Sequence, residues 1–438
     1  MTKTRRVALF WLLLSCGLAV FWAFTLARTS PYGMADFSGV YHDARCLVQH
    51  GDPYKEDEPL RALRIYQAEG GGRPRPSDAL RQIMALNVYP PTTFIFIAPF
   101  AMLPLVPAFL LWMILTVCCI FLAAFLMWDS AANYAPVIAA GFICFVLLNS
   151  EVLLANGNAA GIAVGLCVVA VWCFLMERFV PAGILCLAIS LAIKPHDAGL
   201  VWLYFLLAGG VYRKRALQTL AVTAALAAAA VLWVSHVAPH WMQEMHTIVQ
   251  AASAPGGPSD PGPFSPVNKT GANIIICLQS AVSVFWNDPR IYNPVSYLIV
   301  GVLLLAWSIR TLMARFSLQN AWLALAAVVP LAMLVSYHRP YDAKLLLLSV
   351  PACAMLWAEG GKIRWTALVV NAAGIVFTSD IPLTTLQILT ANMHLSTARL
   401  SGQVLTVMLM QPVPLILLAM SIFYLWIYMR RDLEKGLP

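Results

Sequence analysis

Charge is scarce in this chain of 438 residues. Only 11% of the residues are Asp, Glu, Lys or Arg, whereas 61% are hydrophobic. A soluble domain carries about 25% charged residues, so this shortage excludes an ordinary soluble globular protein. The mean hydropathy of +0.76 agrees with that exclusion. We therefore expect an all-α polytopic membrane protein.

Several recognisable motifs are also missing from the sequence. The net charge of +8 is spread over short Lys/Arg clusters, with no basic stripe interleaved with aromatics, so nucleic acid is not an expected partner. The ten cysteines show no metal-ligand spacing. There is no P-loop, no G-x-G-x-x-G and no D-x-D pair of acids. No nucleotide, metal or other cofactor is therefore expected.

Long apolar segments recur to the end of the chain. The first, Val7 to Ala27, is longer than a secretory signal core and is interpreted as a retained anchor. About twelve membrane spans are predicted in all. They are 7–27, 104–127, 135–153, 159–176, 180–193, 197–211, 216–237, 291–309, 319–336, 345–358, 365–379 and 404–428. The fifth and sixth are short for a crossing and suggest a tilt or a break around Lys194-Pro195.

The Lys and Arg residues of the short connections predict the orientation. With twelve spans they all fall on one side together with both termini, which indicates the cytoplasm. The opposite side then receives two large loops, 28–93 and 238–290, within a single membrane domain of residues 1–438.

The first large loop opens with the most polar stretch of the chain. From Asp36 onward, apolar residues recur at helical spacing, which predicts a short amphipathic helix in the outer interface. Asp36 stands at the expected N-cap position, and Gly51 and Pro53 are expected to end the helix. The predicted polar face includes His42 and Asp43. Asp36 is interpreted either as a helix cap or as a catalytic base.

Other ionisable and polar residues lie near the predicted outer ends of the spans. His338, Arg339 and Lys344 belong to or follow "SYHRPYDAK", where the cations could bind an anion or extend to lipid headgroups. Lys194 and His196 flank Pro195, which interrupts a helix and frees backbone groups for a cavity wall. Two amides follow the third span, where they could hydrogen-bond a substrate or satisfy a helix end: Asn156 and Asn158.

Several stretches together resemble glycosyltransferase family 87, the polyprenol-phosphate-mannose-dependent mannosyltransferases of the GT-C superfamily. The resemblance covers most of residues 34 to 350. The stretches are "DFSGVYHDARCLVQHGDPY", "VYPPTTFIFIAPFAMLPLVPAFLLW", "NGNAAGIAVGL" and "GILCLAISLAIKPHDAGLVWLYFL". The sequence departs from the family where a "G-Q-x-N" motif is frequent and Gly157-Asn158 stands instead.

The resemblance implies a GT-C bundle with large extracytoplasmic loops, in the plasma (inner) membrane, with the active site on its outer face. It implies inverting transfer of a hexose, mannose first, from a polyprenyl-phosphate sugar to a lipid or glycan acceptor. In that family an aspartate at the start of the first loop is the base, which corresponds to Asp36. A histidine in the later loop holds the donor phosphate, which corresponds to His338.

Inverting transfer requires a carboxylate that accepts the proton of the attacking hydroxyl and positive charge at the departing phosphate. Asp43 is an alternative base to Asp36. The phosphate ligands predicted with His338 are Arg339, Lys194 and Lys344, and the acceptor or sugar ligands are Asp43, His196, Asn156 and Asn158. A secondary transporter or lipid flippase, and a non-catalytic membrane subunit, are the competing interpretations.

Overall fold

The computed structural model describes residues 3–30, 33–55, 89–262, 275–390, 393, 397 and 399–431. Within these residues all regular structure is helical, which confirms the all-α prediction. The first half holds α1 (Lys3–Thr29), α2 (Ala35–Val48), α5 (Pro91–Ala101), α6 (Leu105–Ala131), α7 (Pro136–Leu148), α8 (Glu151–Asn156), α9 (Ala160–Leu175), α10 (Val180–Ile193), α11 (Pro195–Leu207) and α12 (Gly210–Val237). The second half holds α13 (Trp241–Ser253), α14 (Leu278–Val282), α15 (Pro289–Met313), α16 (Leu318–Val335), the 3₁₀ helix η2 (Asp342–Ser349), α17 (Val350–Glu359), α18 (Ile363–Phe377), α19 (Asp380–Thr390), α20 (Leu400–Met410) and α21 (Pro412–Arg430).

Seven helices in the described residues are long and apolar enough to cross a membrane, or eight if the bent pair of α18 and α19 forms one span. The other predicted spans contain shorter helices, such as α9, α10 and α11, so the number twelve stays a prediction. The break predicted at Lys194-Pro195 is present, since α10 ends and α11 begins there. The single span predicted at 404–428 is wrong. Pro412 lacks an N–H and restricts Gln411, which separates α20 from α21.

The central helix of the bundle is α16. In its most apolar stretch 83% of the residues are buried, compared with 28% in α1, 22% in α15 and 11% in α12. The exposed positions of α1 carry large apolar side chains such as Phe10, Trp11, Phe21 and Trp22. A contiguous apolar exterior of this kind is stable against lipid and not against water. The chain is therefore a multi-pass membrane protein with α16 in its core and α1, α12 and α15 on its outside.

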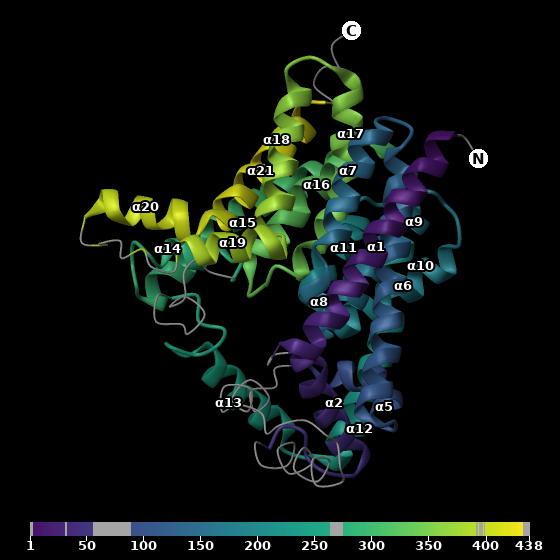
Figure 1. Cartoon of the computed structure of the whole chain (residues 1–438), viewed down its shortest axis with the longest axis vertical. Helices are drawn as coiled ribbons and strands as arrows, with labels where there is room; N and C mark the ends of the chain where they lie inside the picture. The colour runs from purple at the N-terminus through teal and green to yellow at the C-terminus, as the bar shows by residue number, and fades with distance from the viewer. Residues whose placement is uncertain are drawn as a thin grey trace.

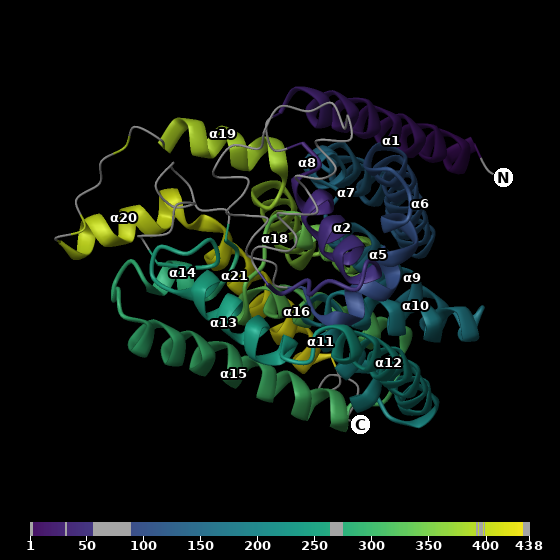
Figure 2. The same cartoon turned by 90° about the horizontal axis from the view of Figure 1, so that it is seen from below.

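The helices divide the molecule into two ends. α1 begins and α21 ends at the same end, where α17 also connects to α18 (Figure 1). α2, α5 and α13 lie at the opposite end (Figure 1). Seen from that end, α19 and α20 extend outward from the bundle, and α1 and α15 occupy opposite edges (Figure 2). Of the two large predicted loops, the structure describes the parts that contain α2 and α13; residues 56–88 and 263–274 lie outside the described residues.

Close approach of α6 and α9 depends on a glycine. A Cβ at Gly165 would lie 2.8 Å from the Cβ of Cys119 and 2.9 Å from its carbonyl carbon. Backbone atoms cannot yield as a flexible side chain would. Small residues of this kind let membrane helices pack at short distance.

We expect Gly165→Ala to lower the melting temperature in detergent, because overpacking costs about 1–3 kcal/mol. Gly141→Ala is the matched control: Gly141 also lies inside a helix, and a Cβ there meets nothing within 4 Å. The control is expected to melt at or slightly above the parent temperature. Equal melting temperatures for the two variants would contradict the close approach.

Candidate active site

The conformation at the start of α2 sets the position of Asp36. Met34 adopts a left-handed conformation (φ 62°) and its N–H donates to the carbonyl oxygen of Ala155 at 2.8 Å. Because this turn starts the helix at Ala35, Asp36 lies in the first turn and Met34 is the N-cap. The prediction that Asp36 caps the helix is therefore wrong, and its carboxylate points to another partner.

That partner is Asn158. The Asn158 side-chain Nδ2 donates to Oδ2 of Asp36 at 2.8 Å, while its Oδ1 accepts the N–H of Ala160 at 2.8 Å. The second bond satisfies the first backbone N–H of α9 and fixes which end of the amide faces Asp36. Gly157 precedes it with φ +67°, and a Cβ there would lie 2.7 Å from the Cβ of Phe37. The turn thus needs glycine for both its conformation and its contact.

An aromatic cluster holds α2 against this turn. The Phe37 ring lies 5.7 Å from the rings of Tyr41 and Trp112 and 5.8 Å from that of Phe109, measured between centroids. The Trp112 indole N–H donates to the Gly157 carbonyl at 2.9 Å. Rings at these separations pack favourably beyond the area they bury. Asp36 and Asn158 therefore face each other across a rigid contact.

The loop after α16 supplies the opposing charge. Its Arg339 guanidinium donates to the Tyr337 hydroxyl and lies over the Tyr337 ring, 5.5 Å from the centroid. Burial acts to lower the pKa of Arg339, but the Tyr337 and Tyr341 phenol groups and the Asp36 carboxylate outweigh it and raise the pKa. Arg339, both tyrosines and Asp36 are each partly exposed. The structure thus brings the predicted base and a predicted phosphate ligand to one accessible place.

Asp342 binds two cationic residues, Arg339 of this loop and Lys194 from the end of α10. Its Oδ1 accepts from the Lys194 ammonium at 2.7 Å, and its Oδ2 accepts the backbone N–H of Arg339 at 2.8 Å. Lys194 is 7% exposed and Asp342 2% exposed. A buried pair of this kind contributes to stability mainly because removal of either partner leaves the other charge uncompensated.

Lys194 reaches Asp342 because the helix breaks at Lys194. Lys194 ends α10 and begins α11 with a non-helical backbone (φ −141°, ψ 84°). Two threonines at the start of α5 satisfy carbonyls freed at the end of α10. Thr93 donates to the carbonyl of Ile193 at 3.2 Å, and Thr92 donates to that of Ala192. The end of the first large loop, where α5 begins, is thereby attached to the break between α10 and α11.

Two histidines and a carboxylate form a group beside the Lys194–Asp342 pair. The Nε2 of His338 lies 3.3 Å from Oδ1 of Asp197, and the Nε2 of His196 lies 3.8 Å from the same oxygen. The His338 Nδ1 faces the Ser336 carbonyl at 3.0 Å, so this nitrogen carries the proton. His338 and Asp197 are buried, whereas the His196 side chain is 38% exposed. Within the described residues these three side chains could hold a metal ion.

The remaining predicted residues lie apart from this arrangement. The Lys344 ammonium donates to the Asn149 carbonyl and acts electrostatically on Glu151 and Asp380. Asp43 is 1% exposed, and burial raises the pKa of its carboxyl well above the usual value. His42 is also buried, so these two residues of the predicted polar face of α2 are covered by other parts of the protein. Asn156 is half-buried at the end of α8.

Sequence reasoning did not select several members of the site. Asp342, Tyr337 and Tyr341 stand within "SYHRPYDAK", and Asp197 follows His196 directly. The available signal was an acid next to cations in a chain with only 20 Asp and Glu residues. Tyr89, which the sequence analysis also did not select, interacts electrostatically with Lys194 and Asp36.

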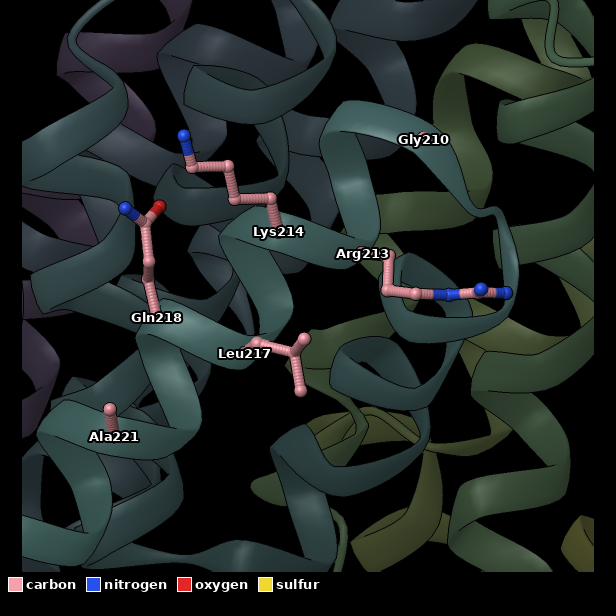
Figure 3. Close-up of a pocket in the computed structure, with 6 residues that line it drawn as sticks. All are labelled: Gly210, Arg213, Lys214, Leu217, Gln218 and Ala221. Carbon is pink, nitrogen blue, oxygen red and sulfur yellow. The ribbon is translucent and has the colours of Figure 1, made fainter.

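A separate hollow of about 460 Å³ lies on the surface of α12. It is lined by one helix alone: Gly210, Arg213, Lys214, Leu217, Gln218 and Ala221. Arg213 and Lys214 extend away from each other in Figure 3. Because no second element converges on it, this hollow does not form a binding site, and the group around Asp36 and Arg339 is the better candidate.

Comparison with known protein families gives one match. Residues 87–336, more than half of the chain, match the family model of glycosyltransferase family 87. The matched range contains Asn158, Lys194 and Asp197, and it ends just before His338. Neither the curated proteins nor the solved structures include a significant match.

The Lys194–Asp342 pair can be tested by a double-mutant cycle on the melting temperature in detergent. Lys194→Met and Asp342→Asn should each destabilise strongly, by about 3–5 kcal/mol, because each leaves a buried charge. The double variant should lose clearly less than the sum of the two, since both charges are gone.

The exposed pair of Arg5 and Asp129 is the matched control, with N–O distance 3.3 Å and side chains 47% and 38% exposed. The same cycle there, with Arg5→Met and Asp129→Asn, should give additive effects below about 1 kcal/mol. Additivity at Lys194 and Asp342 would show that the pair is not coupled.

Proposed function

The chain belongs to glycosyltransferase family 87 and is a membrane glycosyltransferase, and from this premise we propose its reaction. It transfers a hexose, mannose in the first place, from a polyprenyl-phosphate sugar to a lipid or glycan acceptor. The transfer inverts the anomeric centre and takes place on the extracytoplasmic face of the plasma membrane. Family membership favours this reaction over the transport of a lipid or solute.

One observation carries the proposal. The Asp36 carboxylate and the Arg339 guanidinium act on each other electrostatically, and both are partly exposed. An inverting transferase needs such a pair, with a base on one side of the anomeric carbon and positive charge on the other. The charged groups around them, such as Lys194 and Asp342, are buried and therefore suited to support the pair without touching a substrate.

The proposed step balances without a further reactant. The acceptor hydroxyl oxygen forms a bond to the anomeric carbon while the bond from that carbon to the phosphate oxygen breaks. The phosphate leaves with the electron pair, and Asp36 takes the hydroxyl proton. Asn158 binds one Asp36 oxygen and leaves the other for the acceptor.

Asp36 is favoured over Asp43 as the base. Asp43 is 1% exposed and its pKa is raised by burial, so it is protonated over a wider pH range and cannot reach an acceptor as readily. A protonated carboxyl cannot accept a proton. Asn156, Asn158 and His196 remain proposed contributors to acceptor or sugar binding, whereas the buried Asp43 does not.

Arg339 is the proposed direct ligand of the donor phosphate. Guanidinium groups bind phosphate oxygens in pairs, and Tyr337 holds Arg339 from one side. Lys194 adds buried positive charge behind it, and the buried His338 is the proposed neighbouring ligand of the same phosphate. The contact of Lys344 with Asn149 makes it the least direct of the proposed phosphate ligands.

The charged residues of the short connections also support an orientation in the membrane. Lys and Arg residues of the short connections, such as Lys362 and Arg430, indicate the cytoplasmic side together with both termini. α2 lies at the end of the molecule opposite the start of α1 (Figure 1). We therefore assign Asp36 to the outer face, where a polyprenyl-phosphate sugar is available and a cytoplasmic nucleotide sugar is not.

Asp36→Asn should reduce transfer by about 10²–10⁴-fold, because the amide cannot take the proton. It keeps the shape and still accepts from Asn158, so the melting temperature and donor binding should change little. Asp43→Asn is the matched control on the same helix and should retain much more activity. A normal rate in Asp36→Asn with loss in Asp43→Asn would move the base to Asp43.

Arg339→Ala should weaken donor use by about 10–100-fold, the value of a hydrogen bond to a charged group. Arg339→Lys should restore part of it, because the charge remains and the paired geometry is lost. The acceptor KM should stay constant. Arg290→Ala, at an exposed arginine, is the control. An unchanged donor KM in Arg339→Ala would remove Arg339 from the phosphate site.

The donor class is tested with purified protein and membrane extract as the source of acceptor. Radiolabelled polyprenyl-phosphate mannose should be used without any nucleotide sugar, and polyprenyl-phosphate glucose less well. GDP-mannose should give no product in the same reaction. Product from GDP-mannose alone in the purified system would contradict the proposal.

A further inference from the structure

The group formed by His196, Asp197 and His338 has the chemistry of a metal site. His196 and Asp197 lie in the first turn of α11, and His338 lies in the loop after α16. Their ligand atoms all lie within 4.8 Å of one another. The two imidazole rings are 4.9 Å apart and nearly perpendicular, at 69°. Residues far apart in the sequence therefore converge on one point.

The buried atoms of this group have only one another as partners. The His338 Nε2 lies 3.3 Å from Oδ1 of Asp197, which makes a buried ion pair when the imidazole is protonated. Among the described residues no other group forms a hydrogen bond to the His338 Nε2 or to the Asp197 carboxylate, so a metal ion could take the place of that proton. Lys194 acts on Asp197 electrostatically, yet its hydrogen bond goes to Asp342. His338 and Asp197 are 0% and 1% exposed, so water does not satisfy these atoms from bulk solvent.

We propose that His196, Asp197 and His338 bind a transition-metal ion of the Zn²⁺ class. Two imidazoles and a carboxylate suit Zn²⁺, whereas Mg²⁺ and Ca²⁺ require oxygen ligands. A tetrahedral zinc site with bonds of about 2.0–2.1 Å places its ligand atoms about 3.4 Å apart. The observed 3.3 Å and 3.8 Å bracket this spacing, and the exposed His196 side chain is free to close the longer one.

The surroundings of His338 match those of a metal-bound histidine. Its Nδ1–H donates to the Ser336 carbonyl at 3.0 Å. A ligating histidine usually donates its second ring N–H in this way, which fixes the ring and directs the other nitrogen to the metal. The Ile276 N–H binds the carbonyl of His338 at 2.8 Å and holds its backbone as well. The loop is thus built to direct Nε2 toward Asp197.

Three protein ligands leave a fourth position of the ion open. Zinc sites that act on substrates keep such a position, whereas structural sites are closed by four protein ligands. The exposed His196 indicates the accessible side, and Lys194 and Arg339 border the same group. This part rests on the proposed function: the fourth ligand is an oxygen of the donor phosphate. The ion would thereby connect the buried His338 to the phosphate.

Metal binding is measured on the purified full-length protein after chelator treatment and dialysis. Co²⁺ is titrated in, and the visible absorption of four-coordinate Co²⁺ is recorded. We expect one ion per chain, displaced by Zn²⁺. His196→Ala and Asp197→Asn should weaken binding at least 10-fold. His246→Ala, an exposed histidine on α13, should bind as the parent does.

Three outcomes separate the two proposals. Absence of Co²⁺ binding, or equal binding by the site variants and the parent, overturns the metal site whatever the transfer assay gives. Farnesyl phosphate, added to the Co²⁺-loaded protein, should shift the Co²⁺ spectrum, and an unchanged spectrum overturns the phosphate ligand. Co²⁺ binding without transfer from polyprenyl-phosphate mannose leaves the metal site standing and overturns the proposed function.

Discussion

The buried ion pair between Lys194 and Asp342 is the constraint on which the rest of the site depends. It joins the break between α10 and α11 to the loop that follows α16. The Asp342 carboxylate also accepts the backbone N–H of Arg339, so the pair helps to set the position of the Arg339 guanidinium. A buried pair of this kind is stable only when both partners are present. The helix break at Lys194 therefore has a partner elsewhere in the chain, and the loop after α16 is held in a defined place.

The position of Asp36, the proposed base, depends on packing and not on charge. The aromatic cluster around Phe37 fixes α2 against the turn at Gly157, and Asn158 then binds Asp36 in one orientation. The residues that hold the site are buried, whereas Asp36 and Arg339 are partly exposed. This division suits the proposed reaction: the two residues proposed to act on the substrates are accessible, and the groups that hold them are protected from solvent.

The sequence predicted the features that depend on local pattern. The all-helical membrane class follows from apolar length, α2 from its spacing and the break at Lys194 from Pro195. The N-cap at Asp36 failed because a contact with Ala155, distant in the sequence, starts α2 earlier. The roles of Asp342 and Asp197 were missed because each depends on a partner more than 140 residues away: Lys194 for Asp342, and His338 for Asp197. Burial of Asp43 was likewise hidden, since helical spacing alone does not tell which elements cover a polar face.

The central claim is that Asp36 and Arg339 face opposite sides of one anomeric carbon. A cryo-EM structure of the full-length protein with a polyprenyl-phosphonate mannose analogue, which cannot release its phosphonate, tests this most directly. The account predicts that the phosphonate oxygens contact the Arg339 guanidinium and that the Asp36 carboxylate faces the anomeric carbon from the opposite side. A phosphonate bound away from Arg339, or a sugar whose anomeric carbon faces Asp43, would contradict it.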